Sequence, residues 1–218
     1  MGQSLRPGFF ARWGRVTLSS GGGFAASRRQ GESRGLGIDL AQTEEFDVSL
    51  GLRFDGGRNE SDSDALAGMG NVARTVRARA AAEWRFAKDW RLSGAWTVDA
   101  FGRGGGNLGE ASLRREWRFG ERLSMGVGGT LTIAGERYLQ TYFGVTPEQS
   151  RRSGYPVYSP SFGARDLATF VSMRAEIGNH WVAVGGVGYT WLLGPAAKSP
   201  LSQRDHYLGM SAGVGYRF

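Results

Sequence analysis

Apolar and polar residues alternate with a period of two along most of this chain. In FDVSLGLRFD, residues 46–55, every even position is apolar and every odd position is polar or glycine. Successive side chains of a β-strand point to opposite faces, so this pattern predicts a strand with one apolar and one polar face. The same alternation recurs over 75–86, 91–100, 123–133, 167–177 and 207–218. No helical period is sustained, and the chain is predicted to be all-β.

The predicted strands are joined alternately by short and long connections. Residues 86–90, 119–123 and 177–181 form tight turns, whereas 56–71, 144–165 and 194–205 are long and polar. The tetrapeptide EWRF occurs at 83–86 and again at 116–119, each time directly before a tight turn. Hairpins that recur in this way predict an antiparallel up-and-down meander of about eleven strands. We expect residues 1–218 to form a single domain.

Two barrel architectures use such a meander. A lipocalin-like barrel turns its apolar face inward, whereas an outer-membrane barrel turns it toward lipid and keeps polar residues in the lumen. The alternating segments run for ten or more residues, which suits a tilted membrane strand of about 9–11 residues. The polar faces also carry many charges: Arg77, Arg79, Arg85, Arg114, Arg118, Arg174, Arg217, Glu83, Glu116, Glu176 and Asp99. We therefore predict a transmembrane β-barrel of the bacterial outer membrane.

Aromatic residues gather at the strand ends, as expected at a membrane interface. Trp84, Phe86 and Trp90 flank one tight turn, and Trp117 and Phe119 precede the next. Arg115 does not fit, because it falls on the apolar face of its strand. A bulge that shifts the register or a misplaced strand would explain it.

The composition agrees with a membrane barrel and argues against a nucleic-acid-binding protein. The formal charge of +7 invites a nucleic-acid reading, but the arginines are scattered along the chain without forming a basic stripe. We expect no nucleic-acid partner. The longest uncharged run, residues 181–197, is interrupted by glycines and Pro195 and is a poor transmembrane helix. The absence of cysteine excludes disulfides and thiolate metal sites.

The segment YLQTYFGVTPEQSRRSGYPVYSPSFGARD, residues 138–166, resembles the signature of the MipA/OmpV family of outer-membrane proteins. SDSDALAGMGNV at 61–72, the loop with KSPL at 198–201 and the terminal GYRF are also similar. The resemblance implies a location in the outer membrane of a Gram-negative cell, with contacts to lipid and lipopolysaccharide and assembly by the barrel assembly machinery. It further implies about twelve strands and a signal peptide, so we expect a leader and a first strand upstream of Met1.

The resemblance also implies a function. The best-known members are described as scaffolds that hold a lytic transglycosylase and a murein synthase at the peptidoglycan. A scaffold role, without enzymatic activity, is the function that we expect here. An alternative is a small passive channel that favours anions, because arginines line the predicted lumen.

The loop over 144–165 is the candidate binding region, since a loop of about twenty residues without secondary structure is uncommon unless it is functional. We expect it to form a lid over the barrel mouth or a docking surface; the alternative is a loop packed only for its own stability. The candidate binding residues combine aromatic groups with charge: Tyr142, Phe143, Arg151, Arg152, Tyr155, Tyr158, Arg165 and Asp166.

Motifs for catalysis, cofactors or metals are weak. GGGNLG at 104–109 has the glycine spacing of a phosphate loop, but no helix is expected after it, and DSD at 62–64 lacks the rest of a calcium loop. We expect no cofactor and no metal. The remote alternative, an outer-membrane hydrolase, would use His206 with Asp205 and Ser199 or Ser202, while His180 falls in a tight turn.

The chain ends on alternating apolar residues that include Tyr216 and Phe218. This pattern resembles the C-terminal signal by which outer-membrane barrels are recognised for assembly. We expect the same residues to face lipid in the closing strand.

Overall fold

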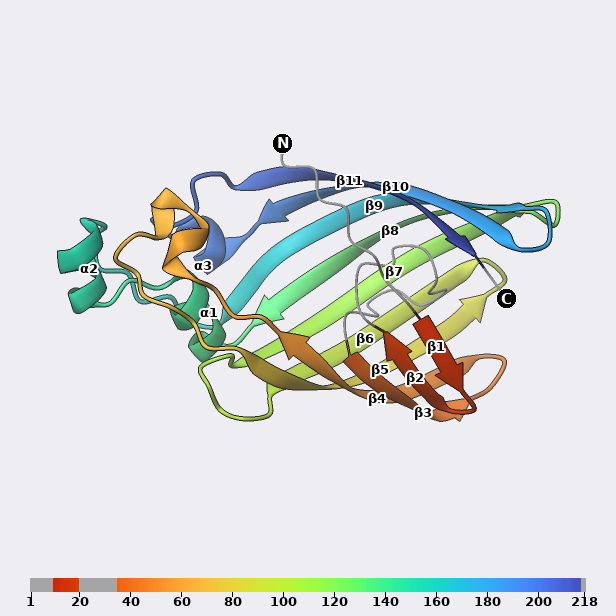
Figure 1. The fold of residues 1–218 in the computed structure, drawn as a ribbon, viewed down its shortest axis with the longest axis horizontal. Helices are drawn as coiled ribbons and strands as arrows, with labels where there is room; N and C mark the ends of the chain where they lie inside the picture. Colours follow the sequence, from red (N-terminus) through yellow and green to blue (C-terminus); the bar gives the residue numbers. More distant parts are fainter. Residues whose placement is uncertain (1–9, 20–34, 217–218) are drawn as a thin grey trace.

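The fold is a single sheet of eleven antiparallel strands that follow one another in chain order (Figure 1). It comes from a computed structural model that describes residues 10–19 and 35–216. The strands are β1 (Phe10–Trp13), β2 (Val16–Ser19), β3 (Gly35–Gln42), β4 (Phe46–Asp55), β5 (Thr75–Ala87), β6 (Trp90–Asp99), β7 (Asn107–Phe119), β8 (Leu123–Ala134), β9 (Gly163–Ile177), β10 (Trp181–Leu192) and β11 (His206–Tyr216). The predicted meander, its strand number and its tight turns are confirmed.

The two faces of the sheet have the distribution of an outer-membrane barrel. Apolar side chains point outward and are exposed, as at Leu50 and Val214, which are 45% and 67% exposed. Polar side chains point to the concave side and are buried or half-buried: Thr132 is 3% exposed and Asp47 is 9% exposed. This is the inverse of a water-soluble protein. The outer-membrane arrangement is therefore confirmed over the lipocalin-like one.

Ion pairs fill the charged wall of the interior. Arg85 Nη1 lies 2.6 Å from Asp47 Oδ2, and Arg91 Nη1 lies 2.8 Å from Glu116 Oε2. Arg79 pairs with Glu110 in the same way. The other side of the interior, on β8, has glycines instead. A Cβ at Gly128 would lie 2.6 Å from the Phe170 ring, so this glycine makes room for an aromatic side chain inside the barrel.

Aromatic residues surround the short-turn end, as predicted. Trp84 and Phe86 are in ring contact at 5.3 Å, and Trp181 meets Tyr216 at 5.0 Å. Both explanations for Arg115 are wrong. Strand β7 pairs without a bulge on either side, and Arg115 lies on the outer face opposite Trp90 and Val127. The guanidinium stacks on Trp90 and Trp117, which lets a cation sit on an apolar face.

The sheet has two free edges in the part of the chain that the structure describes. Ten antiparallel pairings join β1 to β11 in sequence, and none joins β11 back to β1. Because eleven strands alternate in direction, the two edge strands β1 and β11 run in the same direction. A barrel that closes with antiparallel pairing needs an even number of strands. The expected upstream strand stays a prediction, and Phe218 of the expected assembly signal lies outside the described residues.

Three helices gather at the long-loop end of the sheet (Figure 1). They are α1 (Glu136–Phe143), α2 (Pro147–Ser153) and α3 (Gly194–Ala197), and the loop after β4 adds the 3-10 turns η1 (Glu60–Asp62) and η2 (Asp64–Leu66). The prediction of a loop without secondary structure over 144–165 is therefore wrong, since α2 lies within it. No helix in the described ranges is long and apolar enough to cross a membrane.

Candidate functional site

Helix α1 is held at the long-loop end by a small apolar cluster. Gly135 caps its first turn, Glu136 places a favourable negative charge there, and Gly144 ends it. Leu139 is fully buried and packs against Ala134 and Ala196. Four partly buried side chains surround this cluster: Leu108, Tyr138, Phe143 and Leu192. The helix is thus tied to strands β7, β8 and β10 and to α3.

Helix α2 is built by the motif that follows α1. Thr146 is the N-cap, Pro147 takes the first helical position, and Gln149 completes a capping box with Thr146. Gly154 ends the helix in the left-handed conformation with a φ of 79°. Gln149 also donates a hydrogen bond of 2.7 Å to the carbonyl of Met69. The TPEQS segment therefore folds this loop and fastens it to the loop after β4.

A polar cluster links α1 to strands β4 and β5. The Tyr142 hydroxyl donates to Asp55 Oδ2 at 3.2 Å, and the same oxygen accepts a hydrogen bond of 2.6 Å from Arg77 Nε. Arg58 Nη1 donates to the carbonyl of Tyr142 at 3.0 Å. Tyr142 is thus held through both its side chain and its backbone.

Tyr138 lies at the centre of this cluster. Its ring stacks on Tyr142 with the centroids 4.6 Å apart. The Arg77 and Arg165 guanidinium groups lie 5.3 and 5.6 Å from its centroid, and Arg165 Nη1 donates to its hydroxyl at 3.0 Å. Arg165 also pairs with Asp166, which is 4% exposed. Two tyrosines are therefore interleaved with arginines where the helix meets the sheet.

The electrostatics of the cluster favour a neutral phenol. Burial and the neighbouring Asp55 raise the pKa of Tyr142 to about 12. Burial lowers the pKa of Arg58, since desolvation disfavours a charge. Two buried nitrogens, Arg58 Nε and Arg77 Nη2, have no hydrogen-bond partner among the described residues. These two N–H groups are the unsatisfied hydrogen-bond donors of the cluster.

The chain matches, over residues 7–218, the family model described as "MltA-interacting protein MipA". The chain belongs to the MipA family. It is also similar to "Putative outer membrane protein YiaT" of Escherichia coli strain K12 and of Escherichia coli O157:H7, in each case 29% identical over 192 residues, covering 84% of this chain and 74% of the relative. The protein is accordingly an outer-membrane protein.

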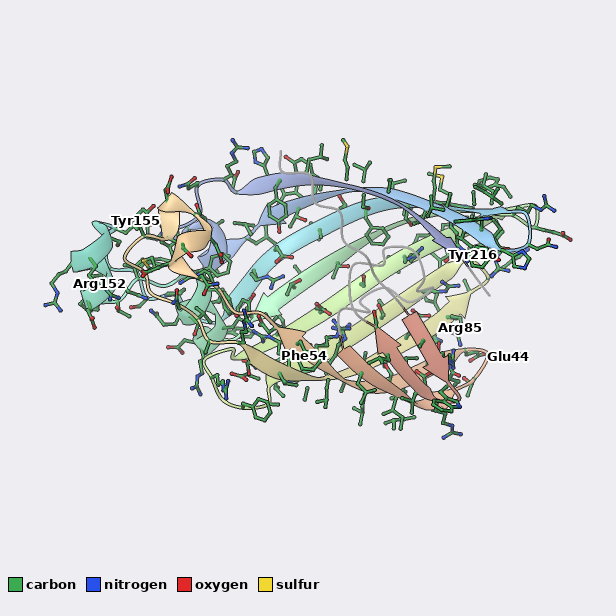
Figure 2. All side chains as sticks on the ribbon, viewed as in Figure 1. Glu44, Phe54, Arg85, Arg152, Tyr155 and Tyr216 are labelled. Atoms are coloured by element: carbon green, nitrogen blue, oxygen red, sulfur yellow. The ribbon has the colours of Figure 1, made fainter. Side chains whose placement is uncertain are left out.

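This MipA-family chain brings only some of the predicted binding residues together. Tyr142, Arg165 and Asp166 meet in the polar cluster, while Phe143 lies beside them against the apolar cluster. Tyr158 donates to the carbonyl of Pro195 at 2.8 Å. Figure 2 places Arg152 and Tyr155 at the outer end with α2, and Arg151 is exposed on the same helix. Their role in binding stays a prediction.

Four members of the polar cluster were not predicted as site residues: Tyr138, Asp55, Arg58 and Arg77. Tyr138 opens the motif that carries the family resemblance, so its position was a usable signal. Asp55 and Arg58 lie 87 and 84 positions before Tyr142, and no local pattern connects them to it.

The residues of the remote hydrolase hypothesis do not form a triad. His206 Nδ1 lies 2.6 Å from Asp205 Oδ1, where β11 begins, and its ring stacks on Tyr189. The Ser199 hydroxyl donates to the carbonyl of Phe143 at 2.6 Å, and the Ser202 hydroxyl donates to that of Ala196 at 2.7 Å. Both serines are engaged in folding the loop. Within the described ranges no group of three or more acidic or histidine residues could hold a metal ion.

Proposed function

We propose that this protein is a non-enzymatic scaffold of the outer membrane that holds a lytic transglycosylase, and with it a murein synthase, next to the peptidoglycan. The observation that carries the proposal is the match of residues 7–218 to a family described by its interaction with MltA, a lytic transglycosylase. A scaffold needs a stable platform and an exposed rim, and both are present in the fold.

The interior supports a platform better than a pore. Several charges of β5, β6 and β7 pair across the strands, as in Arg79 with Glu110 and Arg91 with Glu116. Ion pairs between neighbouring strands hold the charged side chains in place and stiffen this wall of the sheet. Helix α1 adds a further obstruction at the long-loop end, where Leu139 anchors it. A rigid sheet wall suits a protein that positions others.

The short-turn rim is the surface that we assign to the partner. In outer-membrane barrels the short turns face the periplasm, where the peptidoglycan and its enzymes lie. Figure 2 places Glu44 and Arg85 at this end, opposite α2. The turns there expose charges of both signs: Glu44, Glu45, Lys88, Glu121 and Arg122. Such a rim suits recognition of a charged protein surface.

Affinity capture tests the scaffold. The full chain, tagged and expressed in its host, is purified from envelope extracts after mild cross-linking, and the captured wall enzymes are identified by mass spectrometry. Charge reversal at the periplasmic rim, with Lys88→Glu and Arg122→Glu, is expected to lower the yield of lytic transglycosylase. The matched control is Lys198→Glu with Arg204→Glu, two exposed residues of the long loop between β10 and β11. Absence of any wall enzyme from the wild-type capture would overturn the proposal.

A second candidate function is a small anion-favouring channel. The observation that favours it is the pair of buried, unpartnered nitrogens on Arg58 and Arg77 at the long-loop end. Planar bilayers separate the two functions: single-channel steps with anion preference, altered in Arg58→Gln, would support the channel. A silent bilayer removes it.

The hydrolase hypothesis has little support, because Ser199 and Ser202 donate their hydroxyl protons to backbone carbonyls. His206→Ala is expected to leave the capture of wall enzymes unchanged.

A further inference from the structure

The outer face of the sheet carries an apolar groove next to the side chain of Arg115. The groove has a volume of about 770 Å³ and crosses β6 to β10. The groove is formed because small residues, including Ala111 and Gly129, lie between larger neighbours such as Leu113 and Leu131. The groove lies on the face that is exposed to lipid, and an acyl chain is the group that fits it.

Arg115 lies at the short-turn side of this groove. In the register of the sheet it is opposite Trp90 and Val127, two residues that themselves line the groove. Gly129 is one outward-facing position farther from the short turn along β8. The apolar groove thus begins where the cation is placed, and it extends from there toward the middle of the sheet.

The guanidinium of Arg115 is oriented but not neutralised. It stacks at 5.4 Å from the Trp90 centroid and at 4.8 Å from the Trp117 centroid. Among the residues that the structure describes, no carboxylate pairs with it, and its buried Nε has no hydrogen-bond partner. A cation on a lipid-facing surface is unfavourable, most of all at the midplane and less near the interface. A phosphate would satisfy its charge and the N–H groups of its two Nη atoms.

We propose that this surface binds one phospholipid of the periplasmic leaflet, with its phosphate on Arg115 and an acyl chain in the groove between Leu113 and Val187. The two tryptophans hold the guanidinium at the depth of the headgroups, as aromatic residues do at membrane interfaces. Arg recognises phosphate through paired N–H donors, and its planar group stacks on indole at the same time. The site is independent of the proposed scaffold function.

Two substitutions test the two halves of the site. Arg115→Gln removes the charge. Gly129→Leu fills the groove, and it is sterically possible because a Cβ there would meet only Ala168 O at 3.6 Å and Thr169 Cγ2 at 3.9 Å. Each has a matched control on the same sheet. Arg118→Gln removes an exposed arginine from the other face of β7, and Ala80→Leu places the same leucine side chain on the outer face of β5, outside the groove.

The full chain is folded in detergent micelles, its fold is checked by heat-modifiable mobility on a gel, and it is titrated with dioleoyl phosphatidylglycerol under native mass spectrometry. We expect one lipid to be retained, with the affinity reduced about tenfold in Arg115→Gln and in Gly129→Leu. Arg118→Gln and Ala80→Leu should bind as the wild type does. Dioleoylglycerol, which lacks the phosphate, should bind about tenfold more weakly to the wild type.

Three results would overturn the proposal. They are equal retention by the wild type and both site variants, loss in Gly129→Leu alone, and equal binding of dioleoylglycerol. The second and third would leave Arg115 without a role in lipid binding.

Discussion

The Tyr142 hydroxyl donates a hydrogen bond to Asp55 Oδ2 and so joins helix α1 to the last residue of β4, 87 positions earlier in the chain. The same carboxylate accepts a hydrogen bond from Arg77 Nε on the neighbouring strand β5. This three-residue connection fastens the helix to the sheet wall. The long-loop end is therefore an ordered cap, and its stability can be measured separately from that of the barrel.

Tyr142→Phe is expected to loosen the cap. It removes the hydroxyl and keeps the ring that stacks on Tyr138, at a cost of about 1 kcal/mol. Trypsin cleavage after Arg151 and Arg152 should become several-fold faster while the barrel keeps its heat-modifiable mobility. Tyr155→Phe is the matched control, because no hydrogen bond of the Tyr155 hydroxyl is formed with the described residues. Equal cleavage of both variants would contradict the role of the bond.

Alkaline pH is expected to release the same cap. The pKa of Tyr142 is raised to about 12 from an ordinary value of 10.0. Since the folded state favours the neutral phenol, its contribution is fully present below pH 10 and is lost as the pH rises toward 12. The absorbance change at 295 nm of the wild type minus that of Tyr142→Phe should have its midpoint near 12. A midpoint near 10 would show that the phenol is solvated.

The strands and their faces were predictable because alternation is a local property. In β4 the polarity of each residue from 46 to 55 predicts the face on which its side chain lies. The structure confirms this, with Leu50 on the outer face and Asp47 on the inner face. The tight turns follow from the same pattern, because each one ends an alternating run. Membrane strands, whose two faces meet different solvents, make this signal strong.

Helix α1 could not be predicted in the same way. It is only eight residues long, and its Tyr, Thr and Phe residues favour strands in isolation. Its helical form depends on Leu139 reaching Ala196, a contact between distant segments. Both explanations offered for Arg115 were wrong for a related reason. The alternation identified its face correctly, but the two indole rings that accommodate the charge come from positions on two strands.

Gly106→Ala is expected to displace α1. Gly106 has a φ of +56°, and a Cβ there would lie 2.4 Å from the backbone nitrogen of Tyr138. Gly102 is the matched control in the same loop, with a φ of +65° and no atom within 4 Å of a Cβ. Both alanines carry a backbone strain of about 1 kcal/mol, so only the clash differs. The cap should be released at a much lower temperature in Gly106→Ala than in Gly102→Ala. The release is measured as the onset of tryptic cleavage during heating.

Thr146→Ala is expected to unfold the start of α2 without moving α1. The Thr146 hydroxyl accepts from the Gln149 backbone N–H at 3.2 Å, and Gln149 Oε1 accepts from the Thr146 backbone N–H at 2.9 Å. Loss of such a cap costs about 1 kcal/mol. Hydrogen exchange of residues 147–153 should become about fivefold faster, while residues 136–143 keep their protection. Thr146→Ser retains the oxygen and is the conservative control. If its exchange rose as much as that of Thr146→Ala, the cap would not be what holds α2.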